Sequence, residues 1–238
     1  MKSWAPEARC PASRSGWYSS MRATLSRHSL IVAIARRPFS SLLIYLLTSG
    51  IFYAWTVKHP LYSPWVISPT WIDEHISFIP DFVPLYLTYL LIMPSFVILS
   101  RRDRNFGVIF LSACAYVLLN LVINACIPTT LSSWTPQLEP YHWGSKLLLS
   151  ADAPNCVFPA GHVGLPACIA ARLYKSRSKS WRIYAAWAIL MSISALTTKQ
   201  HFFPDVVAGA LLGPFVGVVG PKMLFGGTRY GKAARGWN

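Results

Sequence analysis

The chain has 238 residues, of which 53% are hydrophobic and only 13% are charged. About a quarter of the residues of a soluble domain are charged, and here the deficit falls in long apolar blocks. The composition therefore excludes an ordinary soluble domain and indicates a single membrane domain. A net charge of +14 would suggest nucleic acid as the partner of a soluble protein, but the positions of the charges explain it without one.

Residues 1–36 are rich in Arg and Ser and contain a single acid, Glu7. We interpret them as a basic, disordered tail. A transit peptide and a true start at Met21 remain alternatives. The segment has no apolar core followed by a small-residue cleavage site, so it does not predict a secretory signal.

Six apolar segments follow in chain order, separated by polar or Pro-rich stretches. The predicted spans are residues 38–57, 82–99, 106–127, 160–174, 181–198 and 205–224. We therefore predict an all-α, polytopic membrane helical bundle of about six transmembrane helices over residues 37–225, followed by a basic tail at 226–238. The fourth span is shorter than the roughly 20 residues that a bilayer requires, although Arg172 and Lys175 can extend from its end to the interface.

The basic residues alternate with the predicted spans. Of the 22 Lys and Arg residues, all except Lys58, Lys146 and Lys199 lie in four segments that share one side of the membrane if the N-terminus is cytoplasmic. The positive-inside rule uses this bias to set orientation. The rule predicts that both termini lie in the cytoplasm. Most of the net charge of +14 then reflects this topology, and some of it would attract anionic lipid.

The five cysteines show no CxxC spacing. Cys126 and Cys156 fall on the outer side of the predicted topology, so a disulfide between them is one open alternative. The sequence contains no cluster of carboxylates or thiolates suited to a metal ion, and we predict no metal and no cofactor.

A first candidate site lies before the sixth span. Pro204 suits the first position of a helix, where no amide hydrogen is needed, so Asp205 would lie in the first turn, four residues after His201. The carboxylate could then accept a hydrogen bond from one imidazole nitrogen and leave the other aimed at a substrate. The alternative is a His–Asp pair that only caps the helix.

A second candidate site lies at the start of the fourth span, where Pro159 and Gly161 interrupt the chain before His162. The free amides and the dipole of a helix N-terminus favour an anion, and His162 could protonate a leaving oxygen as a general acid. The alternative is an interfacial histidine beside an ordinary turn. The predicted topology brings this site and the first to the same outer face.

Together the two patterns, Pro-Ala-Gly-His at 159–162 and Lys-Gln-His-Phe-Phe-Pro-Asp-Val-Val-Ala-Gly at 199–209, resemble the type 2 phosphatidic acid phosphatase (PAP2) superfamily. The resemblance covers about residues 70–215, and it implies a core like that of the lipid phosphatases and vanadium haloperoxidases. The segment 72–86, with Pro80 and Pro84, also looks like the branch that includes inositol-phosphorylceramide and sphingomyelin synthases.

The resemblance implies a mechanism. His201 would attack phosphorus to form a phosphohistidine, Asp205 would support it, and His162 would protonate the leaving group. Water or the hydroxyl of an acceptor lipid would then attack the intermediate. Expected contacts to the substrate phosphate are assigned to residues of the two motifs and to one loop lysine: Lys199, Gly161, Lys146 and Ala160.

The sequence also departs from the family pattern. Ala160 stands where the family commonly has Ser, and Ser194 and Ala195 stand where it usually has Ser-Arg. The first family motif, a Lys followed by Arg-Pro, is not found in residues 127–150. A phosphate site needs positive charge, and only Lys146 and Lys199 are expected near it.

We therefore expect a membrane phosphatase or phosphotransferase acting on a lipid phosphate or phosphodiester, with its site on the non-cytoplasmic face. A non-catalytic relative that binds lipid or acts as a scaffold is the main alternative. A transporter is disfavoured, because the sequence shows no inverted repeat and no charge in the middle of a span. The run Asp73-Glu74-His75 is interpreted as a solvated loop.

Overall fold

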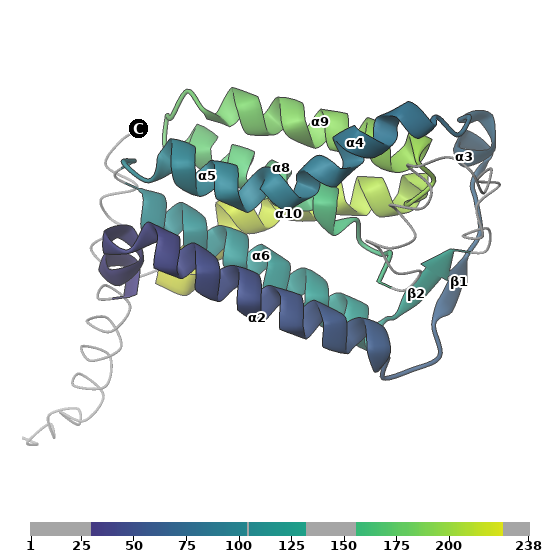
Figure 1. Ribbon diagram of the computed structural model, residues 1–238, viewed down its shortest axis with the longest axis horizontal. Helices are drawn as coiled ribbons and strands as arrows, with labels where there is room; N and C mark the ends of the chain where they lie inside the picture. The colour runs from purple at the N-terminus through teal and green to yellow at the C-terminus, as the bar shows by residue number, and fades with distance from the viewer. Residues whose placement is uncertain (1–29, 104, 132–155, 226–238) are drawn as a thin grey trace, which may run out of the picture.

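The computed structural model describes residues 30–103, 105–131 and 156–225, and its long helices run side by side in one bundle (Figure 1). Residues 30–36 form a short helix ahead of the bundle. The elements that follow are α2 (Pro38–Lys58), β1 (Trp65–Ile67), α3 (Trp71–His75), η1 (Pro80–Phe82), α4 (Val83–Leu87), η2 (Thr88–Leu91), α5 (Ile92–Ser100), α6 (Phe106–Cys126), β2 (Thr129–Leu131), α8 (Gly161–Lys175), α9 (Trp181–Thr197) and α10 (Phe203–Phe225).

Every apolar segment predicted as a span is helical. Four helical stretches are long and apolar enough to cross a membrane, namely 38–58, 80–100, 106–126 and 203–223. The helices α8 and α9 have 15 and 17 residues, fewer than the roughly 20 that a hydrocarbon core requires. The structure therefore supports a multi-pass membrane protein with four candidate spans, two fewer than the sequence predicted.

The second helical stretch is not a regular α-helix. It passes from a 3₁₀ turn at η1 through α4 and the 3₁₀ turn η2 into α5. Pro84 and Pro94 lie in the first turns of α4 and α5, where the missing amide hydrogens cost nothing. The irregular path carries Tyr86 and Tyr89 to the face of the bundle where α8 begins.

The helices α8 and α10 pack with their backbones close together, because glycines line the contact. A Cβ atom at Gly213 would lie 2.2 Å from the carbonyl oxygen of Gly164, and one at Gly209 would lie 2.3 Å from that of Ala160. Gly217 continues the series one turn later against the same helix. Small residues four apart are a common means of close helix packing in membranes, and here they fix α10 on α8.

The fold is not entirely α-helical, which corrects the sequence-based prediction. The strands β1 and β2 form a two-stranded parallel sheet in which Trp65 pairs with Thr129. The β2 strand lies in the segment predicted to be a polar loop. Its Thr129 accepts hydrogen bonds from the Cys156 N–H at the carbonyl (3.1 Å) and from the Phe158 N–H at Oγ1 (2.9 Å). The β2 strand therefore holds the segment that leads into α8.

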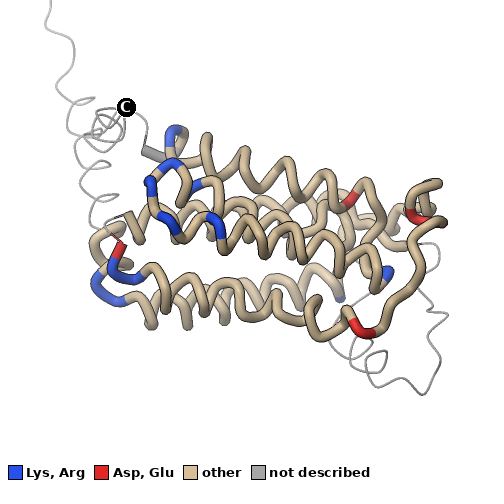
Figure 2. Tube along the Cα trace, turned by 90° about the horizontal axis from the view of Figure 1, so that it is seen from above, with Lys and Arg blue, Asp and Glu red and all other residues tan. Residues whose placement is uncertain are grey.

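The charges of the described residues separate along the bundle (Figure 2). The basic residues at the start of α2, after α5, at the end of α8 and at the start of α9 gather at one end. Lys58 and Lys199 are at the opposite end, where α2 ends and α10 begins. The histidines of both sequence motifs lie at this second end as well.

The predicted tails lie mostly outside the described residues. The last seven residues of the N-terminal one, 30–36, are helical, and their Ile31 and Ile34 are 6% and 8% exposed. A Cβ atom at Gly107 would lie 2.7 Å from the carbonyl oxygen of Ile31, so this short helix packs closely on the start of α6. Cys126 and Cys156 are both free thiols, so the disulfide considered from the sequence is not formed.

Replacing Gly213 by Ala should lower the free energy of unfolding by about 1–3 kcal/mol, the usual cost of overpacking, because the added methyl group meets backbone. Gly50→Ala is the matched control, since a Cβ atom there has no neighbour within 4 Å and alanine is the better helix former. Thermal unfolding in detergent measures both. Equal melting temperatures for the two variants would contradict the proposed packing.

Candidate functional site

Two chain segments far apart in sequence bring their histidines together at one end of the bundle. His162 is the second residue of α8, and His201 lies in the turn between α9 and α10. Their ring centroids are 5.8 Å apart, with the rings inclined at 72°. The two imidazoles are therefore close enough to act on one bound group.

A backbone hydrogen bond joins the two segments directly. The N–H of Ala160 donates to the carbonyl oxygen of Asp205 at 3.0 Å. Ala160 is fully buried, and its carbonyl oxygen lies against Gly209. The amide of Ala160, expected to contact substrate, is therefore engaged within the protein, and this residue sets the spacing of the two histidine segments.

The His201–Asp205 pair is present but does not form the expected hydrogen bond. Nδ1 of His201 lies 3.8 Å from Oδ2 of Asp205, which is beyond hydrogen-bonding distance. Oδ2 instead accepts the N–H of Phe202 at 2.9 Å. His201 is 5% exposed and Asp205 is fully buried, and Nδ1 and Oδ1 both lack a hydrogen-bond partner. Such contacts in ligand-free sites commonly shorten when substrate binds.

Two tyrosines from the second helical stretch surround His162. The ring of Tyr89 stacks on the imidazole at 4.0 Å and 24°, and the ring of Tyr86 meets it edge-on at 5.3 Å and 87°. Tyr86 is fully buried. Because the imidazole is held on two sides, its orientation toward His201 is fixed by packing.

A buried pair of amides on α6 supports the turn before α8. The side-chain amide of Asn120 donates to the carbonyl oxygen of Pro159 at 2.9 Å, and that of Asn124 donates to the Asn120 carbonyl at the same distance. A Cβ atom at Gly161 would lie 3.0 Å from Oδ1 of Asn120. Gly161, expected to bind phosphate, therefore also leaves room for Asn120 against the turn.

Asp73 ties α3 to the His201 turn, although the sequence suggested a solvated loop. It is 3% exposed. Its Oδ1 accepts the N–H of Phe203 at 2.8 Å, while its Oδ2 accepts the N–H of Thr70 at 2.8 Å and the Thr70 hydroxyl at 2.6 Å. Of the three residues in that run, Glu74 and His75 are exposed, so the sequence interpretation is wrong for Asp73 alone.

Lys199 is bound to the same residue through its side chain. Its Nζ donates to the backbone carbonyl of Asp73 at 2.6 Å, and its backbone has a φ of 58°. Partial burial lowers the pKa of Lys199, and the nearby Asp73 carboxylate opposes that shift. An ammonium group has three donors, and one of those of Lys199 is used on this carbonyl.

Lys146, the last of the predicted phosphate contacts, lies outside the described residues. Ser194 and Ala195, at the positions where the resemblance expects Ser-Arg, are fully buried, and the carbonyl of Ala195 accepts the N–H of Gln200 at 3.1 Å. Among the residues described, no three or more His, Cys, Asp or Glu side chains form a group that could hold a metal ion.

Comparison with protein-family models places the chain in a family. The model of the PAP2 superfamily matches residues 104–228, which is more than half of the chain. The chain belongs to the PAP2 superfamily. The match spans α6 to α10 and includes both histidines and Asp205. It begins after Asp73 and the two tyrosines in the sequence, so these residues lie outside it. It gives no support to the sphingolipid-synthase branch that the segment 72–86 suggested.

No curated protein and no solved structure matches this PAP2 chain. The parts of the site that sequence reasoning missed are therefore known from the geometry alone. Asn120 and Asn124 left a signal, since two amides four residues apart in an apolar span share a helix face. Asp73 left a weaker one, the capping box that it forms with Thr70.

Replacing Asp73 by Asn should lower the pKa of Lys199 further, because the negative charge that raises it is removed. Glu74→Gln is the control, since this exposed neighbouring acid is not among the causes of the Lys199 shift. Titration of ¹³C-methylated lysines by NMR measures both variants. An unchanged or raised pKa in Asp73→Asn would contradict the contact.

Proposed function

We propose that the protein is an integral membrane phosphatase or phosphotransferase that acts on a lipid phosphate or phosphodiester through a phosphohistidine at His201. The convergence of His162, His201 and Asp205 at the start of two helices is the observation that carries the proposal. Membership of the PAP2 superfamily supports the same class of reaction.

In the first step, Nε2 of His201 attacks phosphorus and the bond from phosphorus to the leaving oxygen breaks. Nε2 is the nucleophile because Nδ1 faces Asp205, whose carboxylate stabilises the positive charge that develops on the ring. Protonated His162 gives its proton to the leaving oxygen. The products are the phosphohistidine, the free alcohol and a neutral His162.

In the second step, water or the hydroxyl of a lipid attacks the phosphohistidine. Neutral His162 takes the proton of the attacking oxygen, the phosphorus–nitrogen bond breaks, and both histidines return to their first state. Water gives hydrolysis and a lipid hydroxyl gives transfer. Lys199 supplies positive charge for the phosphoryl oxygens, since its Nζ uses one of three donors on Asp73.

A lipid substrate suits a site at the end of a membrane bundle. The helices around it expose large apolar side chains such as Leu90, Leu119 and Val207, which are 58%, 37% and 36% exposed. An acyl chain can therefore stay in the bilayer while its phosphate reaches the histidines. No nucleic acid is needed to explain the basic charge, which gathers at the opposite end.

We further propose six spans with both termini in the cytoplasm and the site on the opposite face. The gathering of basic residues at the end away from the histidines supports this orientation under the positive-inside rule. The helices α8 and α9 extend about 22 and 26 Å at 1.5 Å per residue. Arg172 and Lys175 at the end of α8 can reach the interface beyond that length.

A second candidate function is a non-catalytic relative that binds anionic lipid. The specific observation in its favour is that Ala195 is buried where the family usually has Arg, so that no guanidinium reaches the site from that position. Lys199 is then the described cation nearest in sequence to His201. Turnover by the purified wild-type protein separates the enzyme from this candidate.

The deciding experiment offers the purified protein, in mixed lipid vesicles, phosphatidate, isoprenyl pyrophosphate and phosphodiester lipids with and without acceptor alcohols. His201→Ala should reduce turnover by at least about 10³-fold, because it removes the nucleophile. His59→Ala is the control, an exposed histidine at the end of α2. No turnover by the folded wild-type protein on any substrate would favour the non-catalytic candidate.

His162→Ala should reduce turnover of a lipid phosphate by about 10²–10⁴-fold, the usual contribution of a general acid. The same variant should cleave a p-nitrophenyl phosphate ester with a much smaller loss, since that leaving group departs without a proton. Comparing kcat on the two substrates measures the difference. An equal loss on both would show that His162 does not protonate the leaving group.

A further inference from the structure

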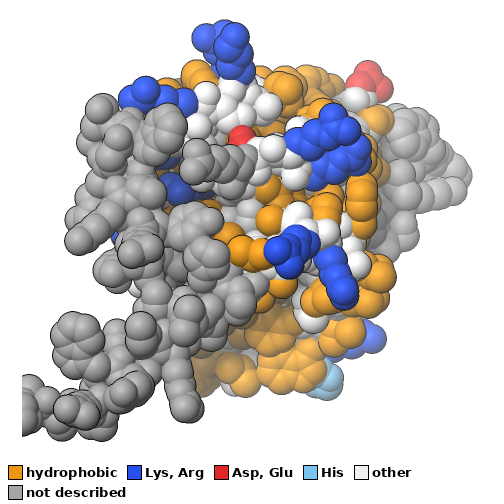
Figure 3. All heavy atoms as spheres, turned by 90° about the vertical axis from the view of Figure 1, so that its left-hand side faces the viewer, with side chains coloured by type: hydrophobic (Ala, Val, Ile, Leu, Met, Phe, Trp, Pro, Cys, Tyr) orange, Lys and Arg blue, Asp and Glu red, His pale blue; other side chains and the backbone are white. Residues whose placement is uncertain are grey.

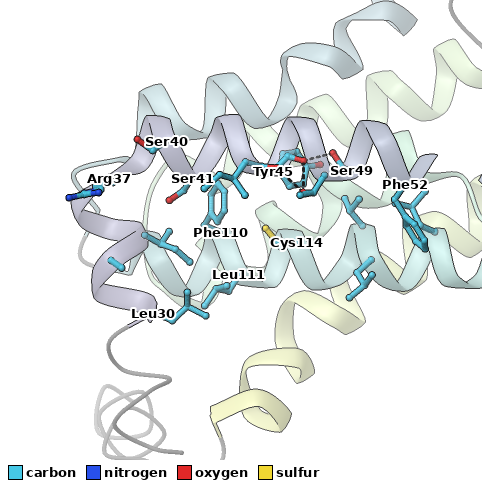
Figure 4. A pocket seen from close by; sticks show the side chains of 17 residues that line it. Leu30, Arg37, Ser40, Ser41, Tyr45, Ser49, Phe52, Phe110, Leu111 and Cys114 are labelled. Carbon is cyan, nitrogen blue, oxygen red and sulfur yellow. Dashed lines mark hydrogen bonds between the residues drawn. The ribbon is translucent and has the colours of Figure 1, made fainter. Parts of the chain in front are cut away.

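A cavity of about 670 Å³ lies between α2, α6 and the short helix at residues 30–36, away from the histidine site. Figure 4 shows Leu30 and Arg37 near one end and Phe52 at the other, with Phe110 and Cys114 of α6 along the floor. Its volume falls within the range of about 300–1,000 Å³ that ligand pockets occupy. None of the residues proposed for phosphoryl transfer lines it.

Most of the residues that line the cavity are apolar, and two of its hydroxyls bond to their own helix. The hydroxyl of Thr48 donates to the carbonyl of Ile44 at 2.7 Å, and that of Ser49 donates to the carbonyl of Tyr45 at 2.6 Å. Both hydroxyls thus serve their own helix. A polar ligand would lose its hydration here without compensation, so the walls suit a hydrocarbon chain.

The length of the cavity suits one leaflet of a bilayer. Arg37 and Phe52 are 15 residues apart, which corresponds to about 22 Å along a helix. Half of a hydrocarbon core measures about 15 Å. An acyl chain that starts near Arg37 can therefore stay within the cavity across the whole hydrocarbon thickness of one leaflet.

Arg37 is the only charged residue among the described residues that line the cavity, and it lies at the end of the bundle where basic residues gather. Arg101 lies nearby, with its guanidinium 5.6 Å from the ring of Phe39. Figure 3 shows this end of the molecule, where basic side chains are prominent. The positive potential of these basic side chains favours an anionic headgroup over a zwitterionic one.

We propose that the cavity binds one anionic glycerophospholipid, with an acyl chain between α2 and α6 and its phosphate at Arg37. The occupant is a bound lipid and not a substrate, because its phosphate at Arg37 would lie at the end of the bundle opposite His162 and His201. The binding site is independent of whether the protein turns over a lipid phosphate.

The test uses the full-length protein, equilibrated in nanodiscs that contain phosphatidylcholine and phosphatidylglycerol in a 9:1 ratio and then analysed by native mass spectrometry. The wild type should retain one phosphatidylglycerol. Arg37→Gln should lower the preference for phosphatidylglycerol about five-fold, as expected for one basic residue at an anionic headgroup. Arg36→Gln, an exposed neighbour that does not line the cavity, should keep it.

A second pair of variants tests the acyl chain. Ser41→Phe places a large ring in the cavity and should abolish retention of either lipid, whereas Leu47→Phe, at a position that is 56% exposed on α2 and does not line the cavity, should not. Thermal unfolding checks that each variant folds. If Ser41→Phe does not fold, the comparison of Arg37→Gln with Arg36→Gln decides the result. Equal losses in both arginine variants, or no retained lipid in the wild type, would overturn the proposal.

Discussion

The hydrogen bond from the Ala160 N–H to the Asp205 carbonyl sets the geometry on which the site depends. It joins the turn that presents His162 to the helix start that carries Asp205. It is possible only because α8 and α10 approach to within backbone contact, which Gly164 and Gly213 permit. A side chain in that contact would separate the helices, and the two histidines would separate with them.

Supports from outside this pair of helices then hold each histidine. Asn120 fixes the Pro159 turn from α6, and the two tyrosines of the second helical stretch hold the His162 ring. Asp73 holds the start of α10 from α3. These contacts come from three separate regions of the chain, so a site of few residues requires most of the fold to be assembled.

The two ends of the bundle have different physical tasks. At one end two buried carboxylates, two buried amides and the histidines gather. Asp73, Asp205 and Asn120 are hydrogen-bonded to backbone groups, while Nδ1 of His201, Oδ1 of Asp205 and Oδ1 of Asn124 are left unpaired. Unpaired buried polar atoms are costly and are expected where a ligand completes the arrangement. At the other end Arg37 lies beside a cavity with mostly apolar walls, which suits an anionic lipid.

The sequence by itself determined the helices and the motifs. Every apolar run predicted as a span is helical, and the pattern His-x-x-x-Asp drew attention to His201 and Asp205, which lie close together. The membership in the PAP2 superfamily, expected from those motifs, is confirmed. The number of membrane spans was less well determined, because α8 and α9 are shorter than a bilayer.

Only the tertiary structure decided what surrounds those motifs. The parallel pairing of β1 with β2 joins segments more than sixty residues apart, and no local pattern in a three-residue strand announces its partner. The role of Asp73 depends on a contact 130 residues along the chain, and the 3.8 Å gap between His201 and Asp205 depends on how the turn is packed. Local preferences determine helices, whereas contacts between distant residues appear only when the whole chain has folded.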